Sequence, residues 1–518
     1  MRIFDTDVQK LKYDILREVA RYAYEDRLLD GLTEIPKIIA PGPKPTMRCC
    51  IYKERAIVSE RLKLAMGGDK DNPNTIEVIG IACDECPVST YQVTDACRGC
   101  LAHRCAAACP RGAISFDEHQ KAHIDPDKCI ECGRCAEACQ YSAISNHKRP
   151  CEKACKVKAI TEGENHVAHI DPDKCVECGR CAEACQYSAI SNHKRPCEKA
   201  CKVKAITEGE NHVAHIDESK CIECGACVYQ CPFGAISEKS YILDAIRILR
   251  ESENGKNYKV YAVVAPSISS QFRYAKLGQV ITALKRLGFY NVVEAALGAD
   301  MVAWSEAQEL AEKGFLTSSC CPAFVSYIHK QFPKLVDKIS HNLSPMAMIA
   351  KYLKESEPGS KVIFIGPCTA KKGEAQKDSV KPWVDCVMTF QELQALIDSR
   401  DFEVSELEES HLDNASYFGR VFARSGGVSD AVQEALKEQG IDFTVKPAVC
   451  DGIEQCRMAL LKASRGALPE NFIEGMACIG GCIGGAGCLT HGAKDKSEVD
   501  KYGMEAFEKT ISDAIKVL

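Results

Sequence analysis

Three stretches in the second half of the chain decide its fold: Thr317-Ser-Ser-Cys-Cys-Pro-Ala-Phe324, Gly366-Pro-Cys-Thr-Ala-Lys-Lys-Gly-Glu374 and Glu474-Gly-Met-Ala-Cys-Ile-Gly-Gly-Cys-Ile-Gly-Gly485. Each follows an apolar or glycine-rich segment. Four of their thiols, converging from distant loops, would suit one buried [4Fe–4S] cluster: Cys321, Cys368, Cys478 and Cys482. Taken alone, the pattern favours buried structural cysteines, because free cysteine is among the most buried residue types.

Composition narrows the class of protein. The chain has 518 residues, 33 cysteines and a net charge of −6, which predicts several domains and argues against a nucleic-acid partner. Disulfide scaffolds are short and secreted, whereas this chain is long and its first residues contain no apolar signal segment. No apolar run is long enough to span a bilayer. We therefore expect a cytoplasmic protein, without a membrane partner, whose thiolates bind metal.

The first half contains an internal repeat. Ala122–Val167 recurs as Ala168–Val213 with a single difference, Ile130 against Val176. A shorter, partial copy begins at Ala214 and continues to Cys221. So close a copy indicates a recent tandem duplication or an assembly artefact, and the sequence alone does not separate these. The second copy is a candidate for removal without loss of function.

The repeat carries iron–sulfur motifs. Cys221-x2-Cys224-x2-Cys227-x3-Cys231-Pro has the spacing in which three thiolates hold one [4Fe–4S] cluster and the fourth binds its neighbour. The same motif recurs twice without the proline, and once with two extra residues before its third cysteine. A lone CxxC pair would not exclude a zinc site, but the repeated four-cysteine spacing favours iron–sulfur clusters.

A constant offset predicts how these motifs share ligands. A cysteine stands 20 residues before the first cysteine of three motifs, which defines three equivalent sites, and the remaining motif forms a fourth site. The sites are Cys129/Cys132/Cys135 with Cys109, Cys175/Cys178/Cys181 with Cys155, Cys221/Cys224/Cys227 with Cys201, and Cys97/Cys100/Cys105 with Cys139. Cys185 and Cys231 are also predicted ligands from their motifs.

Several cysteines have no partner in this scheme: Cys151, Cys185, Cys197 and Cys231. Cys83-x2-Cys86 could supply two of the missing ligands, and His147 or His193 could supply nitrogen. Adjacent cysteines without a spaced partner are usually not ligands, which is our interpretation of Cys49 and Cys50. We interpret His103 as a loop residue.

The coarse pattern predicts a multidomain α+β and α/β protein. An amphipathic helix is expected over Asp7–Leu29 with a stop at Gly31, followed by a linker over Ile39–Pro45. Tyr258–Ala265 and Lys361–Ile365 suit buried strands, and Gly278–Leu287 and Asp430–Glu438 suit helices. Their alternation favours parallel sheets covered by helices.

The expected segments are an N-terminal helix and linker, a first cysteine-rich region, duplicated ferredoxin-like [4Fe–4S] modules, and a two-lobed α/β domain. We place them at residues 1–47, 48–120, 121–240 and 241–518.

The three cysteine stretches, in this order and after a ferredoxin-like region, resemble the signature loops of [FeFe]-hydrogenases. The resemblance covers about the last half of the chain. It implies an H-cluster whose [4Fe–4S] part is held by Cys321, Cys368, Cys478 and Cys482. Cys482 would bridge to a di-iron subcluster with CO, cyanide and azadithiolate ligands, which dedicated maturases assemble.

The resemblance also assigns roles to neighbouring residues. Cys320 matches the cysteine that passes protons to the di-iron site, and Lys371 matches the lysine that pairs with an iron-bound cyanide. Pro266 and Ser267 match a segment near the other cyanide. Met476 matches a methionine that packs near the di-iron site.

A proton path follows from the same resemblance. Glu306 and Glu309 are three residues apart in a helical pattern, so both would share one face, and they align with two glutamates of the family's path. Ser340 aligns with its serine. A proton relay with its side chains within hydrogen-bond reach would then consist of Cys320, Glu306, Ser340 and Glu309. The alternative is that the two glutamates are a solvated pair on the surface of an ordinary helix. Glu374 would be a supporting or salt-bridge group.

Some positions depart from the best-studied members. Gly366 stands where they have methionine, the first loop reads Cys-Cys-Pro-Ala-Phe, and the third loop continues with Gly484-Gly-Ala-Gly-Cys488. These changes resemble the group B branch. Cys386, Cys450 and Cys456 are interpreted as core cysteines, and Cys488 as a residue that could lie near the cluster.

The resulting hypothesis is a cytoplasmic hydrogenase that catalyses 2 H+ + 2 e− ⇌ H2. Electrons would enter from ferredoxin or a flavodoxin-like carrier through several [4Fe–4S] clusters, the last of them around Cys221. Two alternatives are an H-cluster-bearing redox or H2 sensor and a hydrogenase-like iron–sulfur assembly scaffold.

Overall fold

The computed structural model describes residues 4–46, 50–69, 76–82, 93–125, 127–130, 132–144, 160–162, 168–170, 195–209, 213–401 and 403–516. The chain divides into two compact units. The first combines Met1–Asp84 with Pro196–Leu518, and the second is Glu85–Arg195. The second unit is therefore an insertion in the sequence of the first. The predicted segment bounds at 120 and 240 do not coincide with these units.

Two helices, not one, open the chain. Helix α1 (Asp7–Tyr24) begins with a capping box, in which the Thr6 Oγ1 accepts from the Gln9 N–H and the Gln9 Oε1 accepts from the Thr6 N–H. The prediction of one helix to Leu29 with a stop at Gly31 is wrong. The chain turns at Asp26, which has a left-handed φ of 56°, and Gly31 lies inside α2 (Leu28–Ile39). Helix α3 (Ile51–Ala65) follows.

Short hairpins and single-turn helices form the ferredoxin-like part of the first unit. Strands β6 (Ile206–Glu208) and β7 (Ala214–Ile216) pair antiparallel, between helices α8 (Pro196–Ala200) and α9 (Ala226–Gln230). Strand β8 (Ile236–Glu238) pairs with β1 (Ile76–Val78), and the 3-10 turn η1 (Gly80–Ala82) follows β1.

The second unit repeats this pattern. Strands β2 (Ile114–Phe116) and β3 (Ala122–Ile124) pair antiparallel beside helices α4 (Arg104–Ala107) and α5 (Arg134–Ala138). Strands β4 (Ile160–Glu162) and β5 (Ala168–Ile170) form a further hairpin of the same register. The described repeats therefore share one small antiparallel hairpin of the same register.

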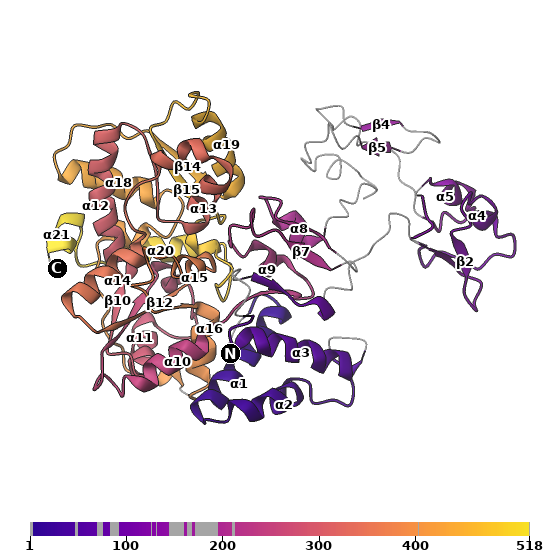
Figure 1. The fold of residues 1–518 in the computed structure, drawn as a ribbon, viewed down its shortest axis with the longest axis horizontal. Helices are drawn as coiled ribbons and strands as arrows, with labels where there is room; N and C mark the ends of the chain where they lie inside the picture. Colours follow the sequence, from indigo (N-terminus) through magenta and orange to yellow (C-terminus); the bar gives the residue numbers. More distant parts are fainter. Residues whose placement is uncertain are drawn as a thin grey trace. The chain divides into compact units, whose positions relative to one another are not determined.

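The first lobe of the α/β domain is built on a parallel sheet with strand order β10-β9-β12-β13. Its strands are buried apolar runs, which is typical of a sheet covered on both faces. The strands are β9 (Val260–Val264), β10 (Asn291–Glu294), β12 (Lys361–Gly366) and β13 (Cys386–Thr389). Its helices, seen in Figure 1, are α10 (Ile242–Glu251), α11 (Leu277–Arg286), α12 (Ala295–Lys313), α14 (Pro345–Ser356) and α16 (Phe390–Asp398).

The second lobe has a smaller parallel sheet with strand order β11-β15-β14. Its strands are β11 (Leu316–Thr317), β14 (Pro447–Asp451) and β15 (Phe472–Met476). Around it lie α13 (Pro322–Gln331), α17 (Tyr417–Val421), α18 (Gly427–Glu438), α19 (Ile453–Ala463), α20 (Asp495–Met504) and α21 (Ile511–Lys516). The predicted alternation of strands and helices in a two-lobed domain is confirmed. No helix within the described ranges is long and apolar enough to cross a membrane.

A buried ion pair joins the ferredoxin-like part to the first lobe. The Lys372 Nζ lies 2.9 Å from the Glu392 Oε2 and donates to the Lys239 carbonyl at 2.6 Å. Glu392 also accepts from the Ser240 hydroxyl and the Tyr241 N–H. Burial alone would raise the pKa of Glu392, but Lys372 and these hydrogen bonds outweigh burial and lower it.

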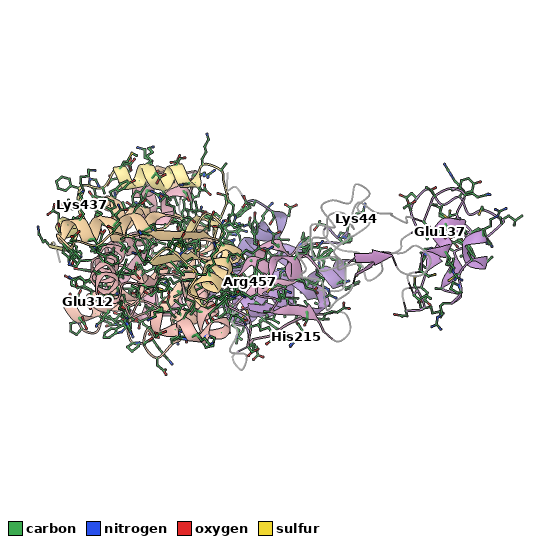
Figure 2. All side chains as sticks on the ribbon, turned by 90° about the horizontal axis from the view of Figure 1, so that it is seen from above. Lys44, Glu137, His215, Glu312, Lys437 and Arg457 are labelled. Carbon is green, nitrogen blue, oxygen red and sulfur yellow. The ribbon has the colours of Figure 1, made fainter. Side chains whose placement is uncertain are left out.

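Breaking this pair should destabilise the first unit strongly. Lys372→Met leaves Glu392 buried without a cation, which we expect to cost about 3–5 kcal/mol. Denaturant unfolding followed by circular dichroism would measure the loss. Lys437→Met is the matched control, since Lys437 lies on the outside of the second lobe (Figure 2), where its pair with Glu434 is exposed. Equal effects of the two substitutions would contradict the role given to the buried pair.

Candidate catalytic cavity and cluster sites

The four predicted thiols meet around one cavity. The cavity has a volume of about 90 Å³ and is lined by Cys321, Cys368, Cys478 and Cys482. Their loops follow the carboxyl ends of β11, β12 and β15, where parallel strands place their connecting loops together. Parallel topology therefore brings together residues that are far apart in the sequence.

Local backbone chemistry sets each loop. Cys321 immediately precedes α13, whose first residue is proline, and Cys482 begins the 3-10 turn η7 (Cys482–Gly484). Gly480 and Gly481 before that turn have left-handed φ values of 83° and 87°. A Cβ on Gly481 would lie 2.8 Å from the Ala423 carbonyl oxygen. Only glycine permits this close approach of the third loop.

The arrangement of the thiols fits a cluster better than a single ion. Throughout the described residues, no three His, Cys, Asp or Glu side chains lie close enough to hold one metal ion. The four thiols line a cavity and do not meet at one point that a single metal ion could occupy. Burial, together with neighbouring Cys321, raises the pKa of Cys482 to about 11 and raises the pKa of Cys368 as well. Iron would supply the positive charge that these thiolates lack.

Further predicted residues also line the cavity. Cys320, Lys371, Met476 and Pro266 lie on its wall. The Ser267 hydroxyl is absent from the wall; it is buried and has no hydrogen-bond partner among the described atoms. The rest of the wall is mostly apolar and was not predicted, because it comes from helices and strands without a motif: Ala295, Ala299, Met346, Phe364 and Phe422.

Lys371 is held over the cavity by Glu374. The Lys371 Nζ lies 2.7 Å from the Glu374 Oε2 and 3.3 Å from the Cys320 carbonyl oxygen. Burial alone would lower the pKa of Lys371, but the Glu374 carboxylate outweighs burial and raises it. Lys371 therefore presents a positive charge to a cavity that has few other polar groups.

Glu306 and Glu309 both lie on α12, in different environments. Glu306 is fully buried, and neither carboxylate oxygen has a hydrogen-bond partner in the described part of the chain. Burial raises its pKa to about 8, although the nearby Ser340 hydroxyl opposes the shift. Burial would also raise the pKa of Glu309, but Lys313 and His341 outweigh it and lower this pKa.

The predicted relay is only partly hydrogen-bonded. The Ser340 hydroxyl donates to the Glu309 Oε2 at 3.1 Å, and Glu309 bonds His341 and Lys313 near the surface. Because Glu306 makes no hydrogen bond, the links from Cys320 to Glu306 and from Glu306 to Ser340 are not formed in this structure. The relay from Cys320 to Glu309 therefore stays a prediction.

A cluster site lies directly beside the cavity. Cys221, Cys224, Cys227 and Cys201 are mutual electrostatic neighbours, and Cys224 also lies near Cys321. Burial raises the pKa of Cys224 to about 12. This site combines Cys201 with the motif that begins at Cys221, as the 20-residue offset predicts.

Gly225 lets the loop that carries Cys224 pack closely against the cavity loops. A Cβ on Gly225 would lie 2.6 Å from the Ala486 Cβ and from the Thr369 Oγ1. The Thr369 hydroxyl, next to Cys368, donates to the Glu223 carbonyl at 2.7 Å. The ferredoxin-like loop and two loops of the cavity are therefore in direct contact.

Among the described residues of the second unit, the thiols form two clusters. Cys109, Cys129, Cys132 and Cys135 line one small cavity. The Cys105 thiol has the Cys139 and Cys100 thiols as electrostatic neighbours, and Cys97 packs in the same core. Which of these thiols bind a cluster stays a prediction. Outside the described residues lie Cys155, Cys175, Cys178, Cys181, Cys185, Cys151, Cys83, Cys86, Cys49, His147 and His193.

The structure also describes the other cysteines and the histidine that the sequence analysis considered in the first half of the chain. Cys231 is buried, packs in one core with Cys197, and its Sγ accepts from the Ala235 N–H at 3.2 Å. The exposed Cys50 caps α3, and His103 stacks on Phe116 with ring centroids 3.7 Å apart.

The four cysteines without a matched role in the second half are all buried: Cys386, Cys450, Cys456 and Cys488. The Cys488 Sγ lies 3.4 Å from the Ile483 carbonyl oxygen, in the loop that carries Cys482.

Family models match the cysteine-rich part of the chain and its α/β part separately. Residues 258–486 match the family model "Iron only hydrogenase large subunit, C-terminal domain". Residues 96–143 match "4Fe-4S dicluster domain", and residues 168–191 and 214–237 match "4Fe-4S binding domain". The chain therefore combines ferredoxin-like 4Fe-4S domains with an α/β domain of the iron-only hydrogenase type, which confirms the predicted fold class.

The similar proteins include hydrogenases and Fe-S cluster assembly factors. Iron hydrogenase 1 of Clostridium pasteurianum is 28% identical over 49% of this chain and 54% of its own length. A probable cytosolic Fe-S cluster assembly factor of Aedes aegypti is 24% identical over 44% of this chain and 61% of its own length. The chain thus spans little more than half of these relatives. A solved [FeFe]-hydrogenase HydA1 from Chlamydomonas reinhardtii aligns at 20% identity over 54% of this chain and 93% of its own, with a TM-score of 0.45.

Gly225→Ala should separate the ferredoxin-like loop from the cavity loops. The new Cβ would clash with Ala486 and Thr369, so we expect a loss of about 1–3 kcal/mol and poorer retention of the adjacent cluster. Gly314→Ala is the matched control, because Gly314 has a similar φ of 73° but no atom within 4 Å of the added Cβ. Thermal unfolding and iron content of the two variants would be compared. A larger effect at Gly314 would refute the contact argument.

Glu306→Gln should change how stability depends on pH. The unfolded carboxyl ionises near its ordinary value of 4.5, whereas burial holds the folded carboxyl protonated to about pH 8. The folded state therefore binds more protons in this window, and wild-type stability falls as pH rises through it. The glutamine variant lacks this loss, so its stability relative to wild type should increase between these limits by a few kcal/mol, on the order of 1.4 kcal/mol per pKa unit.

Melting temperatures of both proteins across this pH range would test the prediction. Glu309→Gln is the control, because the pKa of Glu309 is shifted in the opposite direction. A pH-independent difference between wild type and Glu306→Gln would show that Glu306 does not titrate in this window.

Proposed function

We propose that the chain is an [FeFe]-hydrogenase of the group B type, which catalyses 2 H+ + 2 e− ⇌ H2. The observation that carries the proposal is the cavity itself. Four thiols from three loops surround it, and Cys320, Lys371, Met476 and Pro266 line its wall. A scaffold for a simple [4Fe–4S] cluster would not need a lysine held in the same apolar pocket.

The residues fit an H-cluster. Cys321, Cys368, Cys478 and Cys482 would hold its [4Fe–4S] part, and Cys482 would bridge to the di-iron subcluster with its CO, cyanide and azadithiolate ligands. When bound, this group supplies the redox chemistry that interconverts protons and H2. Lys371 would donate to a cyanide, Pro266 and Ser267 would flank the other cyanide, and Met476 would pack against the di-iron unit.

The chain's own residues would deliver protons. Cys320 lies on the cavity wall, Glu306 lies behind it, and Ser340 and Glu309 connect to the surface at His341. With a pKa of about 8, Glu306 holds a proton at neutral pH and can release it at small cost. Its unpartnered oxygens leave it able to bond either neighbour, which a relay residue requires.

Electrons would arrive through the [4Fe–4S] sites. The site around Cys221 is the last before the cavity, because Cys224 lies beside Cys321 and Gly225 packs on the cavity loops. Ferredoxin or a flavodoxin-like carrier in the cytoplasm would be the partner, with neither nucleic acid nor membrane involved. Dedicated maturases would insert the di-iron subcluster.

A second candidate is an iron–sulfur assembly scaffold with a hydrogenase-like domain. The similarity to a probable cytosolic Fe-S cluster assembly factor favours it, because the identity is close to that of the hydrogenase relative. Such a protein would hold [4Fe–4S] clusters and would not bind CO or cyanide ligands. A sensor that carries an H-cluster with little turnover is a third possibility.

Anaerobic H2 evolution from reduced methyl viologen, after co-production with di-iron maturases, would test the proposal. We expect turnover, and we expect Cys320→Ala to reduce it at least about 100-fold, because positioned acid–base groups contribute factors of this size. Cys386→Ala is the control, since Cys386 is a buried thiol that does not line the cavity.

Infrared spectra would be recorded on the same samples. Iron-loaded protein without CO and cyanide bands would favour the scaffold, and bands without turnover would favour the sensor. Turnover that Cys320→Ala leaves unchanged would contradict the proton path while supporting the enzyme.

A further inference from the structure

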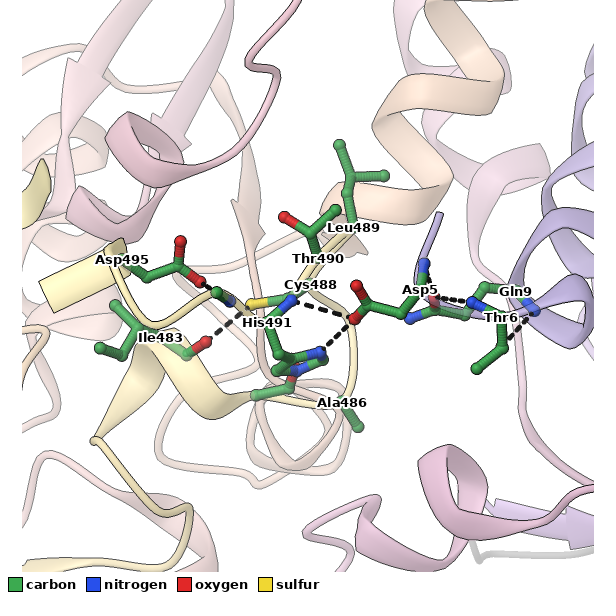
Figure 3. A network of polar contacts seen from close by, with 12 residues as sticks. Asp5, Thr6, Gln9, Ile483, Ala486, Cys488, Leu489, Thr490, His491 and Asp495 are labelled. Atoms are coloured by element: carbon green, nitrogen blue, oxygen red, sulfur yellow. Dashed lines mark hydrogen bonds and ion pairs between the residues drawn. The ribbon is translucent and has the colours of Figure 1, made fainter. Parts of the chain in front are cut away.

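The third cavity loop, residues 478–485, is held in place on two sides. Beyond Cys482, the Gly485 carbonyl oxygen lies 3.0 Å from the His491 Nε2 (Figure 3). Between Cys478 and Cys482, a different set of contacts holds the loop. That set includes a carboxylate that lies outside the sequence motifs.

The segment that follows helix α17 pairs with this loop through its backbone. The Cys482 N–H donates to the Ala423 carbonyl at 2.8 Å, and the Ser425 N–H donates to the Gly480 carbonyl at 3.2 Å. The residues between these two pairs form an isolated antiparallel bridge. The two segments therefore run side by side over three successive residues.

One carboxylate oxygen joins the two segments. The Asp451 Oδ1 accepts from the Gly480 N–H and, at 2.8 Å, from the Ser425 hydroxyl. Asp451 ends strand β14, where it is the register partner of Met476, and its own N–H donates to the Gln455 Oε1 at 3.1 Å. The smaller sheet and α19 therefore fix the position of this carboxylate.

No cation pairs with Asp451 in the described part of the chain. Arg424, the basic residue of the paired segment, forms its ion pairs with Asp430 and Asp500 instead. The Asp451 carboxylate therefore places uncompensated negative charge beside the loop that carries Cys478 and Cys482.

The same contact decides where the Gly480 amide points. Gly481 and Cys482 line the cavity, whereas neither Gly480 nor Asp451 does. A Gly480 N–H that is bonded to Asp451 is not available to a sulfur atom of a cluster in the cavity. Net charge and hydrogen bonds to sulfur both set the reduction potential of an iron–sulfur cluster. Withholding a donor and adding negative charge both disfavour the reduced cluster, which carries one more electron.

We propose that Asp451 is a positioning residue for the cluster of the cavity: its Oδ1 fixes Gly480 between the two thiols and, through its charge and the withheld amide, lowers the reduction potential of that cluster. The inference rests on the proposed function only in that the four thiols hold a cluster, and it applies to a hydrogenase and to an assembly scaffold alike. In a hydrogenase, a lower potential favours the passage of electrons from the cluster towards protons.

Two substitutions separate the hydrogen bonds from the charge. Asp451→Asn removes the charge and keeps an acceptor oxygen, because both bonds end on the same atom. Asp451→Ala removes the oxygen and the charge together. Asp430→Asn is the control, since Asp430 is a half-exposed carboxylate that pairs with Arg424 and makes no bond to residues 478–485 in the described structure.

Hydrogen exchange followed by mass spectrometry on peptides covering residues 477–485 would test the positioning role. The anaerobically purified chain, loaded with iron and sulfide, is compared with the three variants at one pH. We expect Asp451→Ala to raise the exchange rate on the order of tenfold, which corresponds to the loss of one hydrogen bond to a charged group. Asp451→Asn should lie much closer to wild type, and Asp430→Asn should match wild type. The role is overturned if Asp451→Ala exchanges like wild type, or if Asp451→Asn exchanges as fast as Asp451→Ala.

A redox titration monitored by electron paramagnetic resonance would test the effect on the potential. The signal of the cavity cluster is the one that Cys478→Ser removes. We expect this signal to appear at a higher potential in Asp451→Asn, because the charge is lost, and at a still higher potential in Asp451→Ala, where the Gly480 amide is also released. An unchanged potential in both variants would overturn the proposal.

Ser425→Ala provides a second comparison if Asp451→Ala does not fold. It removes one of the two donors and keeps the carboxylate, so exchange should rise while the potential stays near that of wild type. A potential that moves in Ser425→Ala and not in Asp451→Asn would contradict the assigned role of the charge.

Neither measurement needs CO, cyanide or H2 turnover. Wild-type protein that lacks the signal of the cavity cluster would contradict the proposed function, and hydrogen exchange would still decide whether Asp451 positions the loop. Failure of the proposed function and failure of this inference are therefore distinguishable.

Discussion

Everything in the second half of the chain depends on keeping four buried thiols around one cavity. The thiols of Cys321, Cys368, Cys478 and Cys482 come from three strands of two separate sheets, and burial holds the pKa values of Cys368, Cys478 and Cys482 above normal. Such an arrangement is costly unless the backbone enforces it and metal charge compensates it. The parallel strands β11 and β15 end at one edge of the smaller sheet, and the loop after β12 reaches the cavity from the larger sheet. Gly481 lets the third loop approach closely enough to complete the ring of thiols.

The ferredoxin-like part is tied to this cavity by packing and by charge. Gly225 removes the side chain that would keep the Cys224 loop away from Thr369 and Ala486. The buried pair of Lys372 and Glu392 fastens the following segment to the first lobe. A cluster held by Cys221, Cys224, Cys227 and Cys201 would thus have a fixed neighbour, which efficient electron transfer requires.

Most of what the sequence could predict came from the spacing of its cysteines. The 20-residue offset depends only on a local hairpin of constant length, and it groups Cys109 and Cys201 with the motifs whose thiols lie near them in the structure. The apolar runs of β9 and β12 were equally clear, since buried parallel strands leave little ambiguity. Contacts that depend on three-dimensional docking left no local signal, such as the bond from His491 to Gly485 or the unpartnered oxygens of Glu306. The end of α1 was missed because Asp26 turns the chain without a glycine or proline.

The insertion of the second unit between Asp84 and Pro196 has an evolutionary consequence. Both ends of the insertion belong to the first unit, so that unit folds by closing a loop whose length is almost free to vary. The cost of closing a flexible loop grows only with the logarithm of its length, and even a doubling adds only about 0.6 kcal/mol. Adding one repeat length to this loop would therefore have been nearly neutral for the folding of the first unit. The architecture lets the iron–sulfur region be lengthened or shortened by single genetic events while the fold around the cavity stays intact.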